Sequence, residues 1–276
     1  MNLRQLESNF EALAADDPLW TVLSDNTKRG GKWDEDTFYR TGEGVIDDLE
    51  SRLEHLGLPL EGNSAIDFGC GVGRLTFPLS RRFENCCGID ISPSMVSYAN
   101  QRLSRGTKCR FVVNSNTRLG DFDNESIDFA YSAIVFQHIA PRYTFEYFRE
   151  FSRVLKPKGL FVFQLPSHLN PNFEGNRKPF RLLRKRFYYR CKAIAQRLPF
   201  IKSKSFFEMN AIPRERVIAH LEKRCAFEVL ACQDFPAAGP AWISYLYIAR
   251  KNSGRAGACW AHWRQPEESA KGAASS

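Results

Sequence analysis

A glycine-rich turn directly behind an apolar run is the feature that most constrains how this chain of 276 residues can fold. In the stretch AIDFGCGVGR, residues 65–74, three of five consecutive positions are glycines, namely Gly69, Gly71 and Gly73, and Asp67 precedes them. A turn of this kind between a strand and a helix lets a ligand approach backbone N–H groups and the helix N-terminus closely. The stretch therefore predicts a strand-to-helix turn that binds a nucleotide-like cofactor.

Apolar runs and helical patterns alternate on either side of this turn. The pattern predicts strands at 64–68, 85–90, 109–113, 127–134 and 160–165, and helices at 73–83, 92–103 and 142–155. Near-continuous apolar strands alternating with helices are typical of a parallel sheet covered on both faces. A helix at 214–225 then precedes two strands, 226–233 and 242–250, whose short connection requires an antiparallel pair. We expect an α/β fold with a doubly wound, seven-stranded sheet, mostly parallel with one antiparallel C-terminal strand.

The residues around the glycines limit the class of cofactor. The last small residue of a nicotinamide-binding turn is replaced here by Arg74. The Asp67 carboxylate would repel a pyrophosphate but would attract a cationic group. Asp90 ends the second strand about 20 residues after the glycines, where it can accept hydrogen bonds from both ribose hydroxyls. These positions favour a cofactor that carries a positive charge and no phosphate.

Together these stretches resemble the class I S-adenosylmethionine-dependent methyltransferases, particularly bacterial type 11 and 12 members, over residues 33–251. AIDFGCGVGR is similar to the first motif of that family, GIDIS to its ribose-binding acid and RVLKPKGLFVF to the entry into its fifth strand. The terminal helix and antiparallel pair resemble the end of the family's Rossmann-like sheet. The resemblance implies an enzyme that uses S-adenosyl-L-methionine.

The resemblance also implies a set of cofactor contacts. The three glycines would line the methionine and ribose, with Asp67 near the ammonium group and Asp90 at the ribose. Ile91 and Met95 would flank the adenine, although ordinary core packing explains them equally well. The complete set of expected cofactor-binding residues is Asp67, Gly69, Cys70, Gly71, Gly73, Arg74, Asp90, Ile91, Met95, Asn114, Ser115, Asn116, Ala133 and Val135.

One position departs from the family pattern. Members often carry an acidic residue just after the third strand, where it accepts a hydrogen bond from the adenine amino group, but this chain reads VVNSNTRL. Asn114, Ser115 or Asn116 could offer a side-chain oxygen instead. The alternative is a capped turn, which such residues favour.

The loop after the fourth strand, SAIVFQHI, normally faces the transferred methyl group. It lacks the Asn/Asp-Pro-Pro-aromatic pattern of members that methylate amides and exocyclic amines, which favours an oxygen, carbon or other small-molecule nucleophile. His138 is the candidate catalytic residue, as general base, and Gln137 is expected beside the acceptor. Alternatively, His138 caps the following helix or bonds its own backbone.

Residues 1–44 are expected to form a helical lid ahead of the methyltransferase domain at 45–251. Trp33, Phe38 and Tyr39 would close over cofactor and acceptor, with the flexible glycines Gly30, Gly31 and Gly42 beside them. The alternative is a helix whose aromatic side chains pack on the edge of the sheet.

The positive charge is concentrated in one segment. The net charge is +8, but residues 176–204 hold eleven Lys and Arg and no acidic residue. This segment falls in an expected helical insertion, 167–212, and has an amphipathic pattern. It could contact anionic membrane, bind a phosphorylated acceptor or RNA, or form a solvated lid. Nucleic acid is less favoured, because no RNA-binding module accompanies the segment.

The remaining composition limits location and partners. No run approaches a membrane span, so we expect a cytoplasmic protein that contacts the membrane at most peripherally. The eight cysteines show no metal-ligand spacing, so no metal is expected, and free buried thiols in a reducing compartment are predicted. We expect residues 252–276 to form a disordered tail.

The predicted function is methyl transfer to oxygen of a small-molecule or lipid-linked acceptor. An RNA or protein methyltransferase, or a non-catalytic S-adenosylmethionine-binding protein, is the alternative. The sequence does not indicate an oligomeric state.

Overall fold

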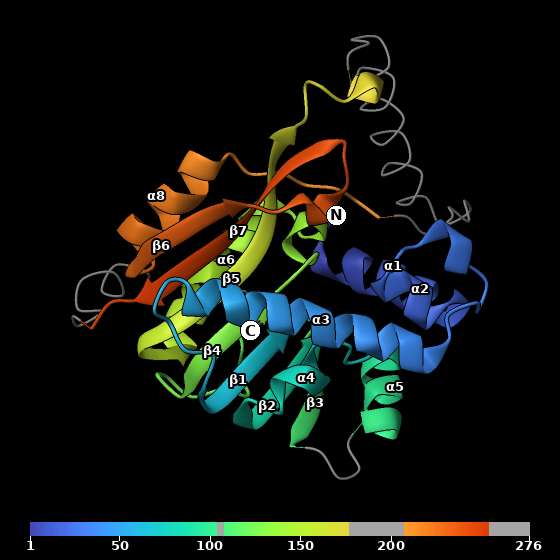
Figure 1. The fold of residues 1–276 in the computed structure, drawn as a ribbon, viewed down its shortest axis with the longest axis horizontal. Coiled ribbons are helices and arrows are strands. Elements are labelled where there is room, and N and C mark those ends of the chain that lie inside the picture. Colours follow the sequence, from blue (N-terminus) through green and yellow to red (C-terminus); the bar gives the residue numbers. More distant parts are fainter. Residues whose placement is uncertain (104–107, 177–206, 254–276) are drawn as a thin grey trace, which may run out of the picture.

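The computed structural model describes residues 1–103, 108–176 and 207–253 (Figure 1). Its centre is a seven-stranded sheet with the strand order β3-β2-β1-β4-β5-β7-β6. All neighbouring strands from β3 to β5 are parallel, whereas β7 is antiparallel to both β5 and β6. The strands are β1 Gly62–Phe68, β2 Phe83–Asp90, β3 Cys109–Val113, β4 Ile127–Ser132, β5 Leu155–Leu169, β6 Phe227–Asp234 and β7 Trp242–Lys251. The predicted fold class is confirmed, including its one antiparallel strand.

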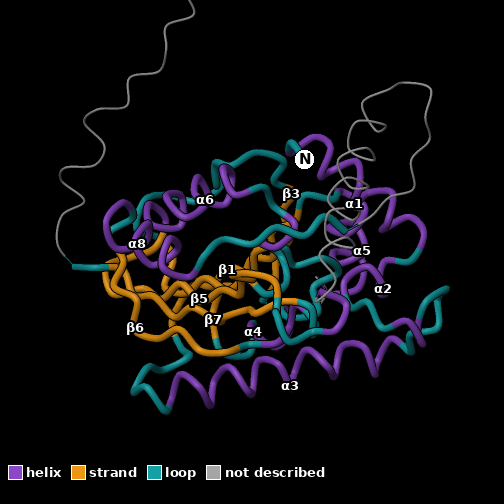
Figure 2. Tube along the Cα trace, turned by 90° about the horizontal axis from the view of Figure 1, so that it is seen from above, coloured by secondary structure: helices purple, strands orange, loops and turns teal. Residues whose placement is uncertain are grey.

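Helices lie on both faces of this sheet (Figure 2). The face with α6 and α8 is closed by phenylalanine rings, because Phe148 and Phe151 of α6 are fully buried and contact the rings of Phe161 and Phe163 of β5. On the opposite face, α3 and α4 pack against the sheet. The helices are α1 Leu3–Asp16, α2 Pro18–Val22, α3 Glu35–Glu54, α4 Thr76–Leu79, α5 Pro93–Leu103, α6 Pro141–Val154 and α8 Arg214–Arg224, with 3₁₀ turns η1 Asn26–Lys28, η2 Phe136–His138, η3 Glu174–Asn176 and η4 Pro236–Ala238.

Two predicted elements have different bounds in the structure. The predicted length of the helix at 73–83 is wrong, since α4 covers only Thr76–Leu79. Gly73 has a φ of +84°, which an α-helix does not accept, and β2 already begins at Phe83. The fifth strand begins earlier than expected, because Leu155 pairs with Ile127 before a bulge around Lys158, whose φ is +67°.

Two carboxylates hold the N-terminal helices in place. Asp17 caps α2 and accepts hydrogen bonds from the backbone N–H groups of Gly30 and Gly31 at 2.8 and 2.9 Å. Glu11 of α1 accepts hydrogen bonds from Ser92 and Ser94 at the start of α5. Two of the glycines expected to be flexible are therefore held by one carboxylate. The expected division between residues 44 and 45 falls inside the continuous helix α3.

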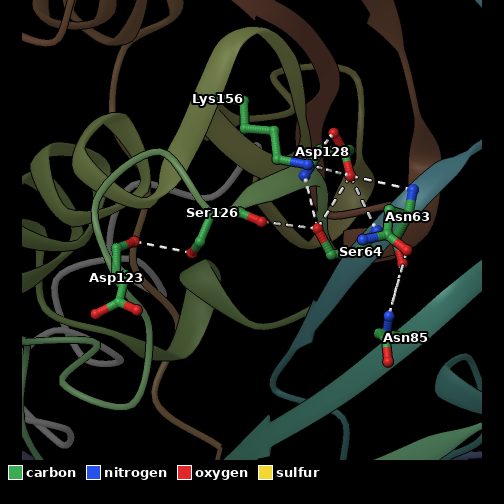
Figure 3. A network of polar contacts seen from close by, with 7 residues as sticks. All are labelled: Asn63, Ser64, Asn85, Asp123, Ser126, Asp128 and Lys156. Atoms are coloured by element: carbon green, nitrogen blue, oxygen red, sulfur yellow. Dashed lines mark hydrogen bonds and ion pairs between the residues drawn. The ribbon is translucent and has the colours of Figure 1, made fainter.

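The amino-terminal edge of the sheet is joined by a polar network around Asp128 (Figure 3). One Asp128 oxygen accepts the backbone N–H groups of Asn63 and Ser64 and the Ser64 hydroxyl at 3.0–3.1 Å, and both oxygens lie within 2.9 Å of Lys156 Nζ. Partial burial opposes ionisation, but these donors lower the pKa of Asp128 below its usual value. The network links the starts of β1, β4 and β5.

No helix within the described ranges is both long enough and apolar enough to cross a membrane. The described cysteines are free thiols, of which Cys70, Cys86, Cys87, Cys109 and Cys225 are buried. The basic segment that the sequence singles out lies outside the described residues from 177 onward, as does the expected tail from 254 onward.

Candidate functional site

A cavity of about 430 Å³ lies at the carboxyl ends of the central strands. Its wall is built by the turn after β1, the end of β2, Asn114 after β3 and residues 133–139 after β4. Because β1, β2 and β4 are parallel neighbours, their carboxyl ends meet at one edge, where ligands bind in folds of this kind. The side chains predicted from four separate stretches are thus brought into one cavity.

The glycine turn after β1 needs glycine for two reasons. Gly69 and Gly71 have φ values of +78° and +53°, a region that L side chains rarely adopt. A Cβ at Gly69 would lie 2.2 Å from Val135 Cγ2, and one at Gly71 would lie 2.4 Å from Val22 Cγ2. The turn is therefore approached closely by the loop after β4 and by α2 of the N-terminal segment.

Asp90 lies at the end of β2 with its carboxylate fixed by backbone donors. Oδ2 accepts the N–H of Gly71 at 2.8 Å, and Oδ1 accepts the N–H of Ser92 at 2.9 Å. Burial raises the pKa of Asp90 above its usual value, although these N–H donors oppose the rise. A carboxylate offers about four acceptor positions, so beyond its backbone donors the group can also accept a ligand hydroxyl.

Asn114 follows β3 and also lines the cavity. Its Oδ1 accepts the backbone N–H of Asn116 at 3.2 Å, whereas its Nδ2 is buried with no hydrogen-bond partner. The Asn114 oxygen therefore caps a turn, and the group without a partner is a donor. Ser115 and Asn116 do not line the cavity, and Asn116 Oδ1 accepts the N–H of Arg118 at 2.8 Å. The capped turn given as the alternative is present.

Opposite charges lie in the cavity wall behind the turn. Asp67 Oδ2 accepts the Thr76 hydroxyl at 2.6 Å, and burial raises the pKa of Asp67 to about 6 despite that bond and the nearby Arg74. Arg74 is 5% exposed, with Nη1 3.3 Å from Thr41 Oγ1 and a buried Nε without a partner. A buried carboxylate and a buried guanidinium in one wall suit the ammonium and carboxylate of an amino-acid group.

His138 in η2 also lines the cavity, but in an apolar setting. Its ring lies 5.6 Å from that of Phe10 and 5.5 Å from that of Phe207. Nδ1 is 2.7 Å from the carbonyl oxygen of Glu208, and burial lowers the pKa of His138 to about 4. At neutral pH the imidazole is uncharged, and its Nδ1–H donates to the Glu208 carbonyl.

The aromatic residues predicted as a lid pack away from the cavity. Trp33 and Phe38 meet edge to face, Phe38 is fully buried, and Tyr39 donates its hydroxyl to the carbonyl of Val72 at 3.0 Å. None of the three lines the cavity, nor does Gly73. The prediction that these aromatic residues form a lid is therefore corrected. They join α3 to α5 and the glycine turn, which agrees with the alternative of packing at the edge of the sheet.

Other residues supply the cover that was expected from those aromatics. Leu6 and Phe10 of α1, Thr21 to Ser24 around the end of α2, and Phe207 and Met209 ahead of α8 line the cavity. The amphipathic pattern of 3–16 was a signal for the first of these, because Leu6, Phe10 and Leu13 recur at helical spacing. Phe207 and Met209 lie in an irregular stretch that carries no periodicity. Of the remaining predicted residues, Cys70, Ile91, Met95, Ala133, Val135 and Gln137 line the cavity as expected.

Comparison with known proteins agrees with this geometry. A family model described as methyltransferase domain matches residues 66–163. YqeM of Bacillus subtilis, which is named as a methyltransferase, is 28% identical over 116 residues, covering 40% of this chain and 44% of its own. Phosphoethanolamine N-methyltransferase 1 of Arabidopsis thaliana is 32% identical over 120 residues, covering 42% of this chain and 23% of its own. The chain thus matches less than half the length of these curated relatives.

Among solved structures, magnesium protoporphyrin IX methyltransferase of Synechocystis PCC 6803 with bound SAH superposes with a TM-score of 0.59 at 17% identity, covering 91% of this chain and 99% of that one. That likeness concerns the fold. The match of the methyltransferase-domain model spans the glycine turn, Asp90 and the loop with His138. The sheet has the Rossmann-like topology of methyltransferases. Residues 66–163 match the methyltransferase-domain family, and the chain is similar in fold to S-adenosylmethionine-dependent methyltransferases, as the resemblance implied.

Proposed function

We propose that the protein transfers a methyl group from S-adenosyl-L-methionine to the oxygen of a small, largely apolar acceptor. The single observation that carries the cofactor assignment is the pairing of Asp90 with the unpartnered Asn114 Nδ2 in one cavity. A carboxylate with spare lone pairs suits the two ribose hydroxyls, and a buried N–H donor suits a ring nitrogen of adenine. A buried N–H donor without an acceptor costs free energy, and a hydrogen-bond acceptor on the ligand would remove that cost.

The same wall fits the amino-acid part of the cofactor. Asp67 and Arg74 offer opposite charges behind the glycine turn. Positive φ at Gly69 and Gly71 leaves the turn without side chains on the approach to its backbone. When bound, S-adenosylmethionine supplies an already activated sulfonium methyl group, so this chain mainly has to bind, orient and exclude water.

The acceptor assignment rests on the part of the cavity beside β4 and β5. Leu6, Phe10, Phe207 and Met209 cover that part, and the adjacent His138 is uncharged at neutral pH. Among the described lining residues, the ionised groups are Asp67, Arg74 and Asp90, all on the cofactor side. In this described part of the wall a phosphorylated or acidic acceptor would meet no second cation, whereas an apolar molecule with one hydroxyl is compatible with it.

The relatives favour methyl transfer without deciding the atom, because the Arabidopsis enzyme is named for transfer to nitrogen. We favour oxygen because the loop at 132–139 lacks the Asn/Asp-Pro-Pro-aromatic pattern of amide-methylating members. The cover over the cavity supports a small acceptor in preference to an RNA or a folded protein. Contact of the basic segment with anionic membrane is retained as part of the proposal, since such contact would give access to lipid-linked acceptors.

Titration calorimetry with S-adenosylmethionine, S-adenosylhomocysteine and NADH tests the cofactor. Binding of the first two and not of NADH is expected. The acceptor is tested by transfer of labelled methyl to three matched sets, namely phenols and prenylated phenols, phosphorylated amines, and RNA. Label in the phenolic set supports the proposal, and transfer only to phosphorylated amines or RNA would overturn it. Cofactor binding without transfer to any set would favour a non-catalytic binding protein.

A further inference from the structure

A buried row of amide groups crosses the end of the sheet beside the cavity. The backbone N–H of Ile134 donates to Gln164 Oε1 at 3.0 Å. Gln164 Nε2 donates to the Ser244 hydroxyl at 2.6 Å and to Gln137 Oε1 at 3.3 Å. Gln164 is fully buried and Gln137 is 4% exposed. A peptide N–H can only donate, so Ile134 fixes which end of the Gln164 amide faces it, and Gln164 in turn fixes Gln137.

The row continues to an irregular segment, residues 207–212, which we call the strap. Gln137 Nε2 lies 3.2 Å from His138 Nε2, and His138 Nδ1 lies 2.7 Å from the Glu208 carbonyl oxygen. Because Gln137 presents a donor, His138 Nε2 must be the unprotonated acceptor, and Nδ1 must carry the hydrogen. The Glu208 carbonyl can only accept, which agrees with this tautomer. The donor and acceptor of each hydrogen bond in the row therefore follow from the backbone groups at its two ends, the Ile134 N–H and the Glu208 carbonyl.

The strap closes the acceptor side of the cavity. The Phe207 ring lies 6.1 Å from that of Phe10 and 5.9 Å from that of Trp20, and Met209 lines the cavity. Two backbone hydrogen bonds also hold the strap to the domain. The Asn210 N–H donates to the Gln137 carbonyl at 2.6 Å. Ile212 N–H donates to the Pro166 carbonyl at 3.0 Å. A short stretch without helix or strand is thus fixed by the row, by these two backbone bonds and by an ion pair between Glu208 and the Met1 amino group at 3.0 Å.

We propose that Gln164, Gln137 and His138 form a directional clasp that fastens the strap over the acceptor, and that His138 is a positioning residue rather than the general base. The lone pair that a base would use is occupied by Gln137 Nε2, and the ring is wedged between Phe10 and Phe207. Catalysis then depends on holding the acceptor in line and excluding water. The inference rests on the proposed function only in taking the covered cavity as the place of methyl transfer.

Two variants of His138 distinguish a positioning role in the clasp from a role as general base. Asn at position 138 can place its Nδ2 donor near the position of His138 Nδ1 but has no counterpart of Nε2, whereas Phe fills the space without any donor. In hydrogen exchange of the whole protein, we expect His138→Phe to speed exchange of the Asn210 and Ile212 amides about tenfold, the equivalent of one neutral hydrogen bond, and His138→Asn to preserve most of their protection. Peptides from β1 should be unchanged in both.

Turnover gives the second arm. With an acceptor in hand, the clasp predicts a higher kcat/KM for His138→Asn than for His138→Phe, chiefly through KM for the acceptor. A general base predicts that both variants lose kcat equally. Equal loss of kcat together with unchanged strap exchange in His138→Phe would overturn the clasp.

Nitrogen NMR of the imidazole tests the direction of the hydrogen bonds in the row. It requires no catalytic activity in any variant. In the native protein at neutral pH we expect a protonated Nδ1 and an unprotonated Nε2 at His138, the signal being assigned by its absence from His138→Asn. In Gln164→Met, which removes the orienting amide, the Glu208 carbonyl still holds the Nδ1–H tautomer, but exchange of the Asn210 amide, which donates to the Gln137 carbonyl, should become faster. A native Nε2–H tautomer would contradict the row even if folding and cofactor binding are normal. These exchange and NMR results need neither cofactor nor acceptor, so their failure is distinct from failure of methyl transfer.

Discussion

The carboxylate of Asp90 accepts the backbone N–H of Gly71 at 2.8 Å, which ties the end of β2 to the glycine turn after β1. The bond fixes Asp90 at the cavity wall and orients the turn. One carboxylate thus both shapes the turn and lines the cavity, so its loss should affect cofactor binding more than the stability of the distant sheet edge.

Replacing Asp90 by Ala should lower the affinity for S-adenosylmethionine by about 10- to 100-fold, because hydrogen bonds to a charged group contribute about 1.5–3 kcal/mol. Titration calorimetry measures the change. Asp128→Asn is the matched control, since Asp128 lies at the opposite edge of the sheet and should leave affinity unaltered. Equal affinities in native protein and Asp90→Ala would remove Asp90 from the cofactor site.

Asn114→Asp should weaken cofactor binding by about 5- to 20-fold, because it replaces the buried, unpartnered Nδ2 donor by an acceptor while keeping the oxygen that caps the turn. The comparison is made by calorimetry at neutral pH with unfolding followed in parallel. Tighter binding by the aspartate variant would instead show that this position accepts a hydrogen bond from the adenine amino group.

Gly71→Ala should destabilise the protein by about 1–2 kcal/mol, the order of the cost of a left-handed backbone at an L residue. The new Cβ would also meet Val22, so the double variant with Val22→Ala should recover part of the loss. Denaturant unfolding measures each free energy. Gly44→Ala in α3 is the control, because nothing lies within 4 Å of a Cβ there and alanine favours a helix. Similar effects at both glycines would refute the local explanation.

The pKa of Asp128 is lowered in the folded protein, so its ionised form stabilises the fold at pH values above the pKa of an unfolded aspartate. This contribution is lost as pH falls through the lower folded-state value. Asp128→Asn should therefore reduce the free energy of unfolding at neutral pH, and the difference from native protein should shrink in acid. Urea unfolding across the acidic range checks the slope, and a difference that is constant with pH would be contrary to the expectation.

The basic segment yields a prediction from sequence. If residues 176–204 contact anionic membrane, replacing Arg181, Arg184, Lys185 and Lys192 by Gln should abolish co-sedimentation with anionic vesicles, because each basic residue near such a surface adds about 1 kcal/mol. Neutral vesicles are the control. RNA gel shifts at low and high ionic strength distinguish a nucleic-acid partner, which would show steep salt dependence. Native protein that binds neither would favour a solvated lid.

Local sequence was enough to place the strands, the glycine turn and Asp90. Alternating apolar runs determine a parallel sheet, and the position of a carboxylate at a strand end follows from chain order alone. The antiparallel pair at the C-terminus follows from a short connection. These features depend on neighbours in the chain, so no knowledge of packing was needed to predict them.

Tertiary structure decided which aromatic and polar side chains reach the cavity. Trp33, Phe38 and Tyr39 have the composition of a lid, yet they pack away from the cavity, and Phe10 and Phe207 take that place from distant parts of the chain. The roles of Asn114 and His138 depended in the same way on which of their atoms were already bonded by Asn116, Gln137 and Glu208. A sequence specifies donors and acceptors, but only the folded chain decides which remain free, because their partners are brought together across long separations in sequence.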